Sequence, residues 1–188
     1  MEQQSAITDI RNEKFRTYDI PVKFGLVAGI VKIIISTIQY QFFLGSWGMS
    51  MLLTFLSFAV GVTFLCVAGA KQRKALGGYM DIKQAFQVMF VAAMIMVVLS
   101  YAYDFIYMRF IDPSMMDTIK ESSLAAAERW GAPQERLDKM AEQFDEQSAS
   151  KMSVGKQLLG FGMYVVAYGF VSFICAAIMK KNKPAYMA

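Results

Sequence analysis

The stretch Ala85–Ile111, AFQVMFVAAMIMVVLSYAYDFIYMRFI, is predominantly apolar and decides the fold class of this chain. An α-helix advances about 1.5 Å per residue, so about 20 residues cross a hydrocarbon core of about 30 Å. Asp112-Pro113 follows directly, and proline disfavours helical structure at the residue before it. We therefore predict a transmembrane helix over residues 85–111.

Three other stretches, at residues 22–44, 47–70 and 158–179, have the same apolar character. The chain is 56% hydrophobic and only 18% charged, whereas soluble domains are about 25% charged. These features predict an all-α polytopic membrane protein with four transmembrane helices. Residues 1–21 are expected to form a polar cytoplasmic tail, and residues 22–188 a single four-helix membrane domain.

The basic residues are concentrated on one side of the predicted membrane domain. The tail with the adjoining Lys23, the connection after the second span and the C-terminal segment carry eleven Lys and Arg against five Asp and Glu. The loop at residues 112–157 carries nine acidic and six basic residues instead. Because Lys and Arg favour the cytoplasmic side, we predict cytoplasmic termini and an extracytoplasmic loop. The same rule accounts for the basic residues without a nucleic-acid partner.

Loop 112–157 has a helical pattern of its own. Ser114 can cap a first helix that runs to about Trp130, Gly131 stops that helix, and Pro133 suits the first turn of a second one. We predict a helical hairpin with an apolar stripe on each helix. These stripes can pack on one another, lie on the membrane surface or bind another protein. The candidate interaction face consists of Met115, Ile119, Trp130, Leu137, Met140 and Phe144.

Polar and charged residues inside the spans form a candidate intramembrane site. Charged side chains at membrane depth are costly, so they are candidates for function. Asp104 can serve as a cation or proton site with Lys32 as its counter-charge. The two lie at different predicted depths, so Lys32 can instead extend toward the headgroups, and Asp104 can bond to tyrosines or to Arg109 as a structural contact. The candidate set is Lys32, Ser36, Gln39, Ser100, Asp104 and Tyr168.

Small residues mark candidate helix-packing faces. Gly25 and Gly29 form a GxxxG pattern in the first span, and Ser57 and Gly61 form a similar small pair in the second. Such faces let helices approach closely in lipid. They can serve packing within one chain or between the chains of a homo-oligomer.

The residues offer little support for catalysis or for a bound cofactor. The chain has no histidine, which removes the commonest metal ligand and general base. Cys66 and Cys175 lie in apolar spans and outside any CxxC pattern, so we interpret them as buried small side chains. We expect no cofactor, no metal site and no catalytic residues.

Two segments are similar to those of a known bacterial family. KFGLVAG, Lys23–Gly29, opens the first span, and GGYMDIKQAFQV, Gly77–Val88, leads into the third. With the break at Asp112-Pro113 and the charged loop after it, the chain resembles domain-of-unknown-function family 4199, a set of small inner-membrane proteins. Asp81-Ile82 stands where a Ser/Thr-Phe pair is expected. The resemblance implies a bacterial cytoplasmic-membrane location and no assigned activity.

The sequence therefore favours a non-enzymatic envelope or interaction protein that acts through its outer loop. The expected partner is the lipid bilayer, and a homo-oligomer and a protein partner at the loop are both open. The alternative is a small oligomeric transporter or channel that uses the polar stripes around Lys32 and Asp104. An enzyme that acts on lipid is a third hypothesis, and no motif supports it.

Overall fold

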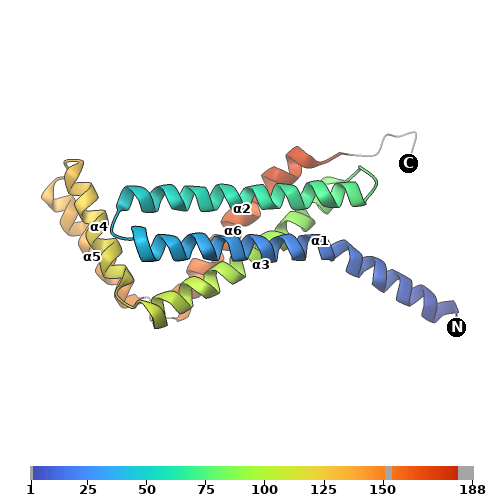
Figure 1. The fold of residues 1–188 in the computed structure, drawn as a ribbon, viewed down its shortest axis with the longest axis horizontal. Helices are drawn as coiled ribbons and strands as arrows, with labels where there is room; N and C mark the ends of the chain where they lie inside the picture. Colours follow the sequence, from blue (N-terminus) through green and yellow to red (C-terminus); the bar gives the residue numbers. More distant parts are fainter. Residues whose placement is uncertain (1, 151–153, 182–188) are drawn as a thin grey trace. The chain divides into compact units, whose positions relative to one another are not determined.

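The computed structural model describes residues 2–150 and 154–181, with side chains for residues 19–146, 155 and 158–181. η1 and η2 are single π-helical turns that continue α1 and α3. The described residues contain no β-strand, so the fold is all-α as predicted. The elements are α1 (Glu2–Ile38), η1 (Gln39–Phe43), α2 (Trp47–Ala75), α3 (Ile82–Ile106), η2 (Tyr107–Ile111), α4 (Met115–Arg129), α5 (Gln134–Ser150) and α6 (Val154–Met179) (Figure 1).

Four helical segments are long and apolar enough to cross a membrane. They match the four predicted spans and confirm the multi-pass membrane fold. The second segment ends later than predicted, at Ala75, because the basic residues after Ala70 continue the helix instead of opening a loop. The segments are Asp19–Phe43, Trp47–Ala75, Ile82–Ile111 and Leu158–Met179.

The chain divides into two compact units, and each is described by itself. Unit 1 comprises Met1–Ile30, Val60–Leu99 and Val165–Ala188. Unit 2 comprises Val31–Ala59 and Ser100–Tyr164. Each unit therefore contains a portion of every membrane helix, and unit 2 also contains α4 and α5.

The core of unit 1 is a buried stripe on α3. α1 packs closely on this stripe at Gly25, where an added Cβ would lie 2.7 Å from the Ala92 carbonyl oxygen. α2 approaches it at Gly69, which lies against the Met89 side chain. The members of the stripe recur every three or four residues and so share one helix face: Ala85, Val88, Met89, Ala92, Ala93, Met96 and Val97.

The connection between α2 and α3 is tied to the end of α6 in unit 1. Gly77 and Gly78 have φ angles of +80° and +92°, a region that suits glycine. Met80 then exchanges two backbone hydrogen bonds of 2.8 Å with Lys181. Asp81 caps α3, because its Oδ1 accepts a hydrogen bond of 2.7 Å from the Gln84 backbone N–H. An aspartate in place of the expected Ser or Thr therefore keeps the capping function.

Unit 2 has its own apolar cluster, which joins the membrane helices to α4. Leu44, Tyr107 and Met115 are buried in it, and Ile119 packs against it. α4 and α5 are in turn joined by an ion pair of 2.6 Å between Lys120 Nζ and Asp145 Oδ1. The helices over loop 112–157 thus occupy nearly the expected residues.

The start of α4 corrects one detail of the sequence analysis. Ser114 occupies the capping position, but its side chain makes no capping hydrogen bond. Its hydroxyl instead donates a hydrogen bond of 2.6 Å to Asp112 Oδ1. The backbone at Ser114 is already helical, with φ −81° and ψ −6°, whereas a capping side chain works from a non-helical residue.

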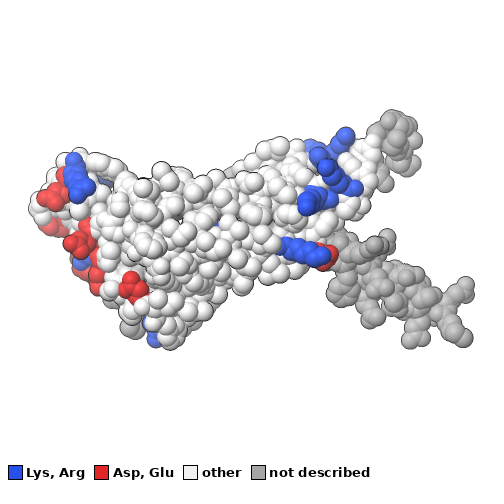
Figure 2. Space-filling view, in the orientation of Figure 1, with Lys and Arg blue, Asp and Glu red and all other residues white. Residues whose placement is uncertain are grey.

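The charged side chains of each unit are unevenly distributed. In unit 1, basic residues gather at the end that carries the α2–α3 connection, and in unit 2 acidic residues cover α4 and α5 (Figure 2). The rest of the described surface visible in Figure 2 is largely uncharged. This pattern agrees with the charge asymmetry of the sequence.

Candidate functional site

The polar cluster of unit 2 is centred on Asp104 of α3. The Tyr40 hydroxyl, in η1, donates a hydrogen bond of 2.9 Å to Asp104 Oδ1. Ser36, one turn before Tyr40, is a side-chain hydrogen-bonding neighbour of the same hydroxyl. The charge of Lys32 also acts on the Asp104 carboxylate. The structure thus brings together Lys32, Ser36 and Asp104 from the predicted set, with a tyrosine between the two helices.

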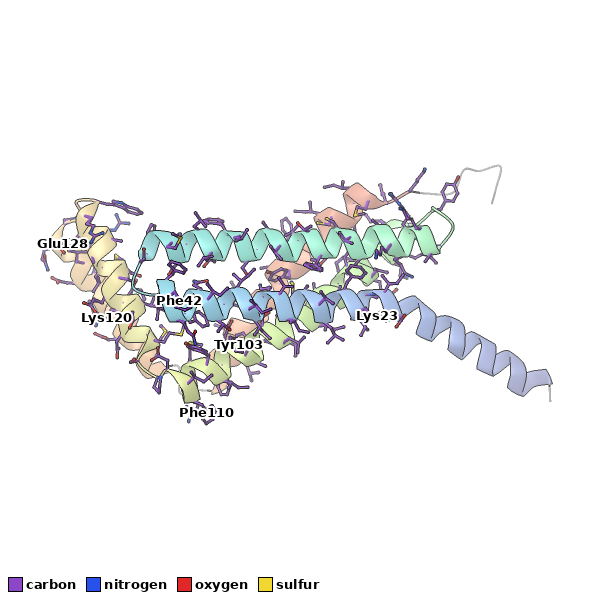
Figure 3. All side chains as sticks on the ribbon, viewed as in Figure 1. Lys23, Phe42, Tyr103, Phe110, Lys120 and Glu128 are labelled. Atoms are coloured by element: carbon purple, nitrogen blue, oxygen red, sulfur yellow. The ribbon has the colours of Figure 1, made fainter. Side chains whose placement is uncertain are left out.

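A second polar contact joins the same helices one turn away. Thr37 Oγ1 lies 2.6 Å from the hydroxyl of Tyr103, which is labelled in Figure 3. Thr37 Oγ1 donates its own proton to the Ile33 carbonyl oxygen at 2.7 Å. Tyr103 must therefore be the donor to Thr37, since a hydroxyl carries only one proton. The two tyrosines act as parallel donors between the first and third membrane helices.

The two π-helical turns meet beside this cluster. Tyr40 of η1 and Tyr107 of η2 have ring centroids 4.9 Å apart. A π-helical turn inserts an extra residue and is uncommon outside functional or strained positions. Tyr40 of η1 contributes its hydroxyl to the Asp104 cluster, and the Tyr107 ring packs beside the Tyr40 ring.

Gln39 does not join the Asp104 cluster, although it was predicted to share a face with Lys32 and Ser36. Its Nε2 donates a hydrogen bond of 3.3 Å to Thr54 Oγ1 of α2. Gln39 is the first residue of η1, and a π-helical turn no longer follows the 3.6-residue period on which the prediction rested. The side chain consequently serves the contact between α1 and α2.

The remaining predicted polar residues are buried in separate units. Ser100 is 9% exposed and belongs to unit 2. Tyr168 is 5% exposed and belongs to unit 1, where its hydroxyl lies beside Gly61. Tyr168 therefore belongs to the packing of unit 1.

The predicted packing residues make close helix contacts within the chain. An added Cβ on Gly25 would meet Ala92 and Ile95, and one on Gly29 would lie 2.8 Å from Leu99 Cδ1. Gly61 lies against the Met96 side chain. Ser57, in unit 2, is 8% exposed. The GxxxG face of the first span is thus occupied by α3.

The Asp104 cluster offers a limited range of chemistry. It combines one carboxylate, tyrosine and serine hydroxyls and a nearby lysine, groups that exchange protons or hold helices together. Among the residues that the structure describes, no group of three or more His, Cys, Asp and Glu is arranged to hold a metal ion.

The α4–α5 hairpin buries only part of its predicted interaction face. Met115 is 3% exposed and packs with Ile119 in the apolar cluster of unit 2. Trp130 is 72% exposed, yet its ring meets that of Trp47 edge-on at 4.6 Å. The other three members, Leu137, Met140 and Phe144, are half-buried.

The exposed surface of the hairpin is acidic. Figure 3 labels one basic and one acidic residue of the hairpin, Lys120 and Glu128. Figure 2 shows the acidic side chains clustered over α4 and α5. Eight carboxylates of the hairpin are exposed: Asp117, Glu121, Glu128, Glu135, Asp138, Glu142, Asp145 and Glu146.

Two features of the structure were missed by sequence reasoning. Tyr40 was not assigned to the polar site, although its spacing of four residues from Ser36 places it on the same helix face. The thiols of Cys66 and Cys175 lie 3.8 Å apart in unit 1. They are 109 residues apart in sequence, and no local pattern signals their contact.

The chain is similar to a known protein family. The family described as "protein of unknown function (DUF4199)" matches residues 23–181, which cover nearly the whole chain. No curated protein and no solved structure matches the chain. The family match confirms the resemblance inferred from the segments around Gly29 and Gly77.

Proposed function

The chain belongs to the DUF4199 family of proteins of unknown function, and from that premise we propose a role in the bacterial envelope. It is a non-enzymatic protein of the cytoplasmic membrane that presents the α4–α5 hairpin on the outer side. The hairpin is an acidic docking surface for a basic segment of a partner protein. The observation that carries this proposal is the contrast between the partly buried apolar side chains of the hairpin and its eight exposed carboxylates.

The attachment of the hairpin to the membrane helices supports a defined orientation. Met115 and Ile119 pack with Leu44 and Tyr107, and Trp47 contacts Trp130. Burial of apolar surface of this kind stabilises the attachment, at roughly 25 cal/mol per Å² removed from water. A surface held in this way loses little conformational entropy when a partner binds.

The charge of the hairpin supports a basic partner. Residues 112–146 contain nine acidic and four basic residues, and eight of the acidic side chains are exposed. An exposed field of one sign attracts oppositely charged partners and accelerates their association. The positive-inside distribution supports an extracytoplasmic position for this surface.

Site-specific photo-crosslinking in intact cells tests the proposal. A photoreactive residue at Glu128 is expected to crosslink to one defined partner, and the same residue at Phe170, a 66% exposed position of α6, is not. The triple variant Glu121→Gln, Glu142→Gln, Asp138→Asn with the same crosslinker should lose most of the product. The matched variant Arg129→Gln, Arg136→Gln should keep it, because it removes the opposite charge from the same hairpin.

The crosslink at Glu128 must also weaken as salt is raised, since contacts between exposed charges are screened beyond about 10 Å at 0.1 M salt. An unchanged product in the neutralised variant would contradict an acidic docking surface.

A second function, a small transporter for protons or monovalent cations, is favoured by the hydrogen bond between Tyr40 and Asp104. Intramembrane carboxylates that are paired with polar groups commonly mark ion pathways. In proteoliposomes, Asp104→Asn and Lys32→Met should each abolish a flux that the wild type supports. Lys23→Met, at an exposed position of the same helix, is the control. Equal flux in all four proteins would exclude this function.

A further inference from the structure

Unit 1 contains a cluster of sulfur atoms that the proposed function does not use. The Cys66 thiol of α2 donates a hydrogen bond of 3.8 Å to Cys175 Sγ of α6. Cys175 is 7% exposed and shares a buried cluster with Met80 and Met89, against which Cys66 and Met179 pack.

Met89 and Met179 converge on one glycine of α2. Gly69 lies one turn after Cys66 on α2, and an added Cβ there would meet the Met89 methyl group and lie 3.5 Å from Met179 Sδ. Met179 in turn lies one turn after Cys175 on α6. Four residues from three helices therefore place two thiols and two thioethers around the same short segment of α2.

We propose that Cys66 and Cys175, together with Met179 and Met89, form a binding site for a soft monovalent metal ion, Cu(I). Thiolate and thioether sulfurs are the ligands that select Cu(I). The separation of the two Sγ atoms, 3.8 Å, fits a shared ion, since two metal–sulfur bonds of about 2.3 Å span at most about 4.6 Å.

The surroundings favour a monovalent ion over zinc. Structural zinc takes four ligands from Cys, His, Asp and Glu, and the described residues contain no group of three or more of these. Cu(I) accepts thioethers in place of the missing ligands. One thiol loses its proton to water when the ion binds, and the resulting thiolate cancels the charge of Cu(I). The occupied site is then neutral, which avoids the cost of a net charge in an apolar region.

The test uses the full chain, reduced and purified in detergent without oxygen. Cu(I) is supplied as its bicinchoninate complex, and the wild type is expected to remove one Cu(I) per chain. Cys66→Ser and Cys175→Ser should each lower the affinity at least tenfold, since loss of even an indirect ligand contact costs about 10–100-fold. Met179→Leu should lower it less. Met163→Leu changes a methionine that is 67% exposed, and should leave the affinity unchanged.

A second measurement on the wild type alone avoids reliance on variants that fail to fold. X-ray absorption of the copper-loaded chain should show a first shell of sulfur atoms at about 2.3 Å. A wild type that leaves all Cu(I) with bicinchoninate would overturn the proposal. A first shell of nitrogen or oxygen would do the same.

Discussion

The Tyr40 hydroxyl donates a hydrogen bond of 2.9 Å to Asp104 Oδ1 and so joins the first membrane helix to the third. It lies where two π-helical turns bring Tyr40 and Tyr107 into ring contact. Tyr40 and Asp104 are 64 residues apart, so this bond is a tertiary contact of the membrane domain. Its contribution to stability can be separated from any role in function.

Removal of the Tyr40 hydroxyl should destabilise the fold modestly. Tyr40→Phe leaves a partly buried carboxylate with one donor fewer, and polar contacts in membranes contribute roughly 0.6–1.7 kcal/mol. In reversible unfolding in mixed micelles we expect a loss within that range. A double-mutant cycle with Asp104→Asn should show coupling between the two residues, and additive effects would contradict the contact. Tyr79→Phe is the control, because it keeps the ring that lies 5.6 Å from Lys181 Nζ.

Substitution of Gly25 should disrupt the contact between α1 and α3. A Cβ at this position would lie 2.7 Å from the Ala92 carbonyl oxygen and 2.9 Å from Ile95 Cβ. Gly25→Ala is therefore expected to lower the free energy of unfolding by about 1–3 kcal/mol.

Gly48→Ala provides the matched control for this prediction. Nothing lies within 4 Å of a Cβ added at Gly48, and alanine is the better helix former. Gly48→Ala should leave stability unchanged or raise it slightly. Equal effects of the two substitutions on the free energy of unfolding would contradict the close approach of α1 to α3.

Loss of the α3 cap should have a small and specific cost. Asp81→Ala removes the acceptor for the Gln84 backbone N–H and should cost about 1 kcal/mol. Asp81→Ser should restore most of the stability, because serine caps helices equally well. Lys83→Ala, at an exposed position in the first turn of α3, tests for general effects of substitution. Equal unfolding curves for Asp81→Ala and Asp81→Ser would exclude a capping role.

Truncation of Met115 should loosen the hairpin from the membrane helices. Met115 is 3% exposed in the apolar cluster with Leu44 and Tyr107, and such truncations cost about 2–5 kcal/mol. Limited proteolysis should cut the α4–α5 hairpin of Met115→Ala faster than that of the wild type. Met163→Ala, at a 67% exposed position, should be cut at the wild-type rate.

The membrane fold was largely predictable because its signal is local. Each span is a continuous apolar run such as Ala85–Ile111, and length and apolarity alone identify it. Gly25 was also identifiable as a packing residue from the spacing to Gly29, although the sequence did not show that α3 is its partner.

The candidate sites were less predictable because they depend on contacts between distant segments. The helical period placed Gln39 beside Ser36, but the π-helical turn directs it to Thr54 instead. The thiol contact of Cys66 and Cys175 depends on how α2 and α6 pack. No single-helix pattern contains that information.

The outward placement of the acidic hairpin is the claim on which the proposed function rests. It is tested by labelling intact cells with a membrane-impermeant maleimide, in a background that carries Cys66→Ser and Cys175→Ser. Glu128→Cys is expected to label in intact cells, and Lys74→Cys only after the cells are permeabilised. Labelling of Lys74→Cys in intact cells, with Glu128→Cys protected until permeabilisation, would contradict the account.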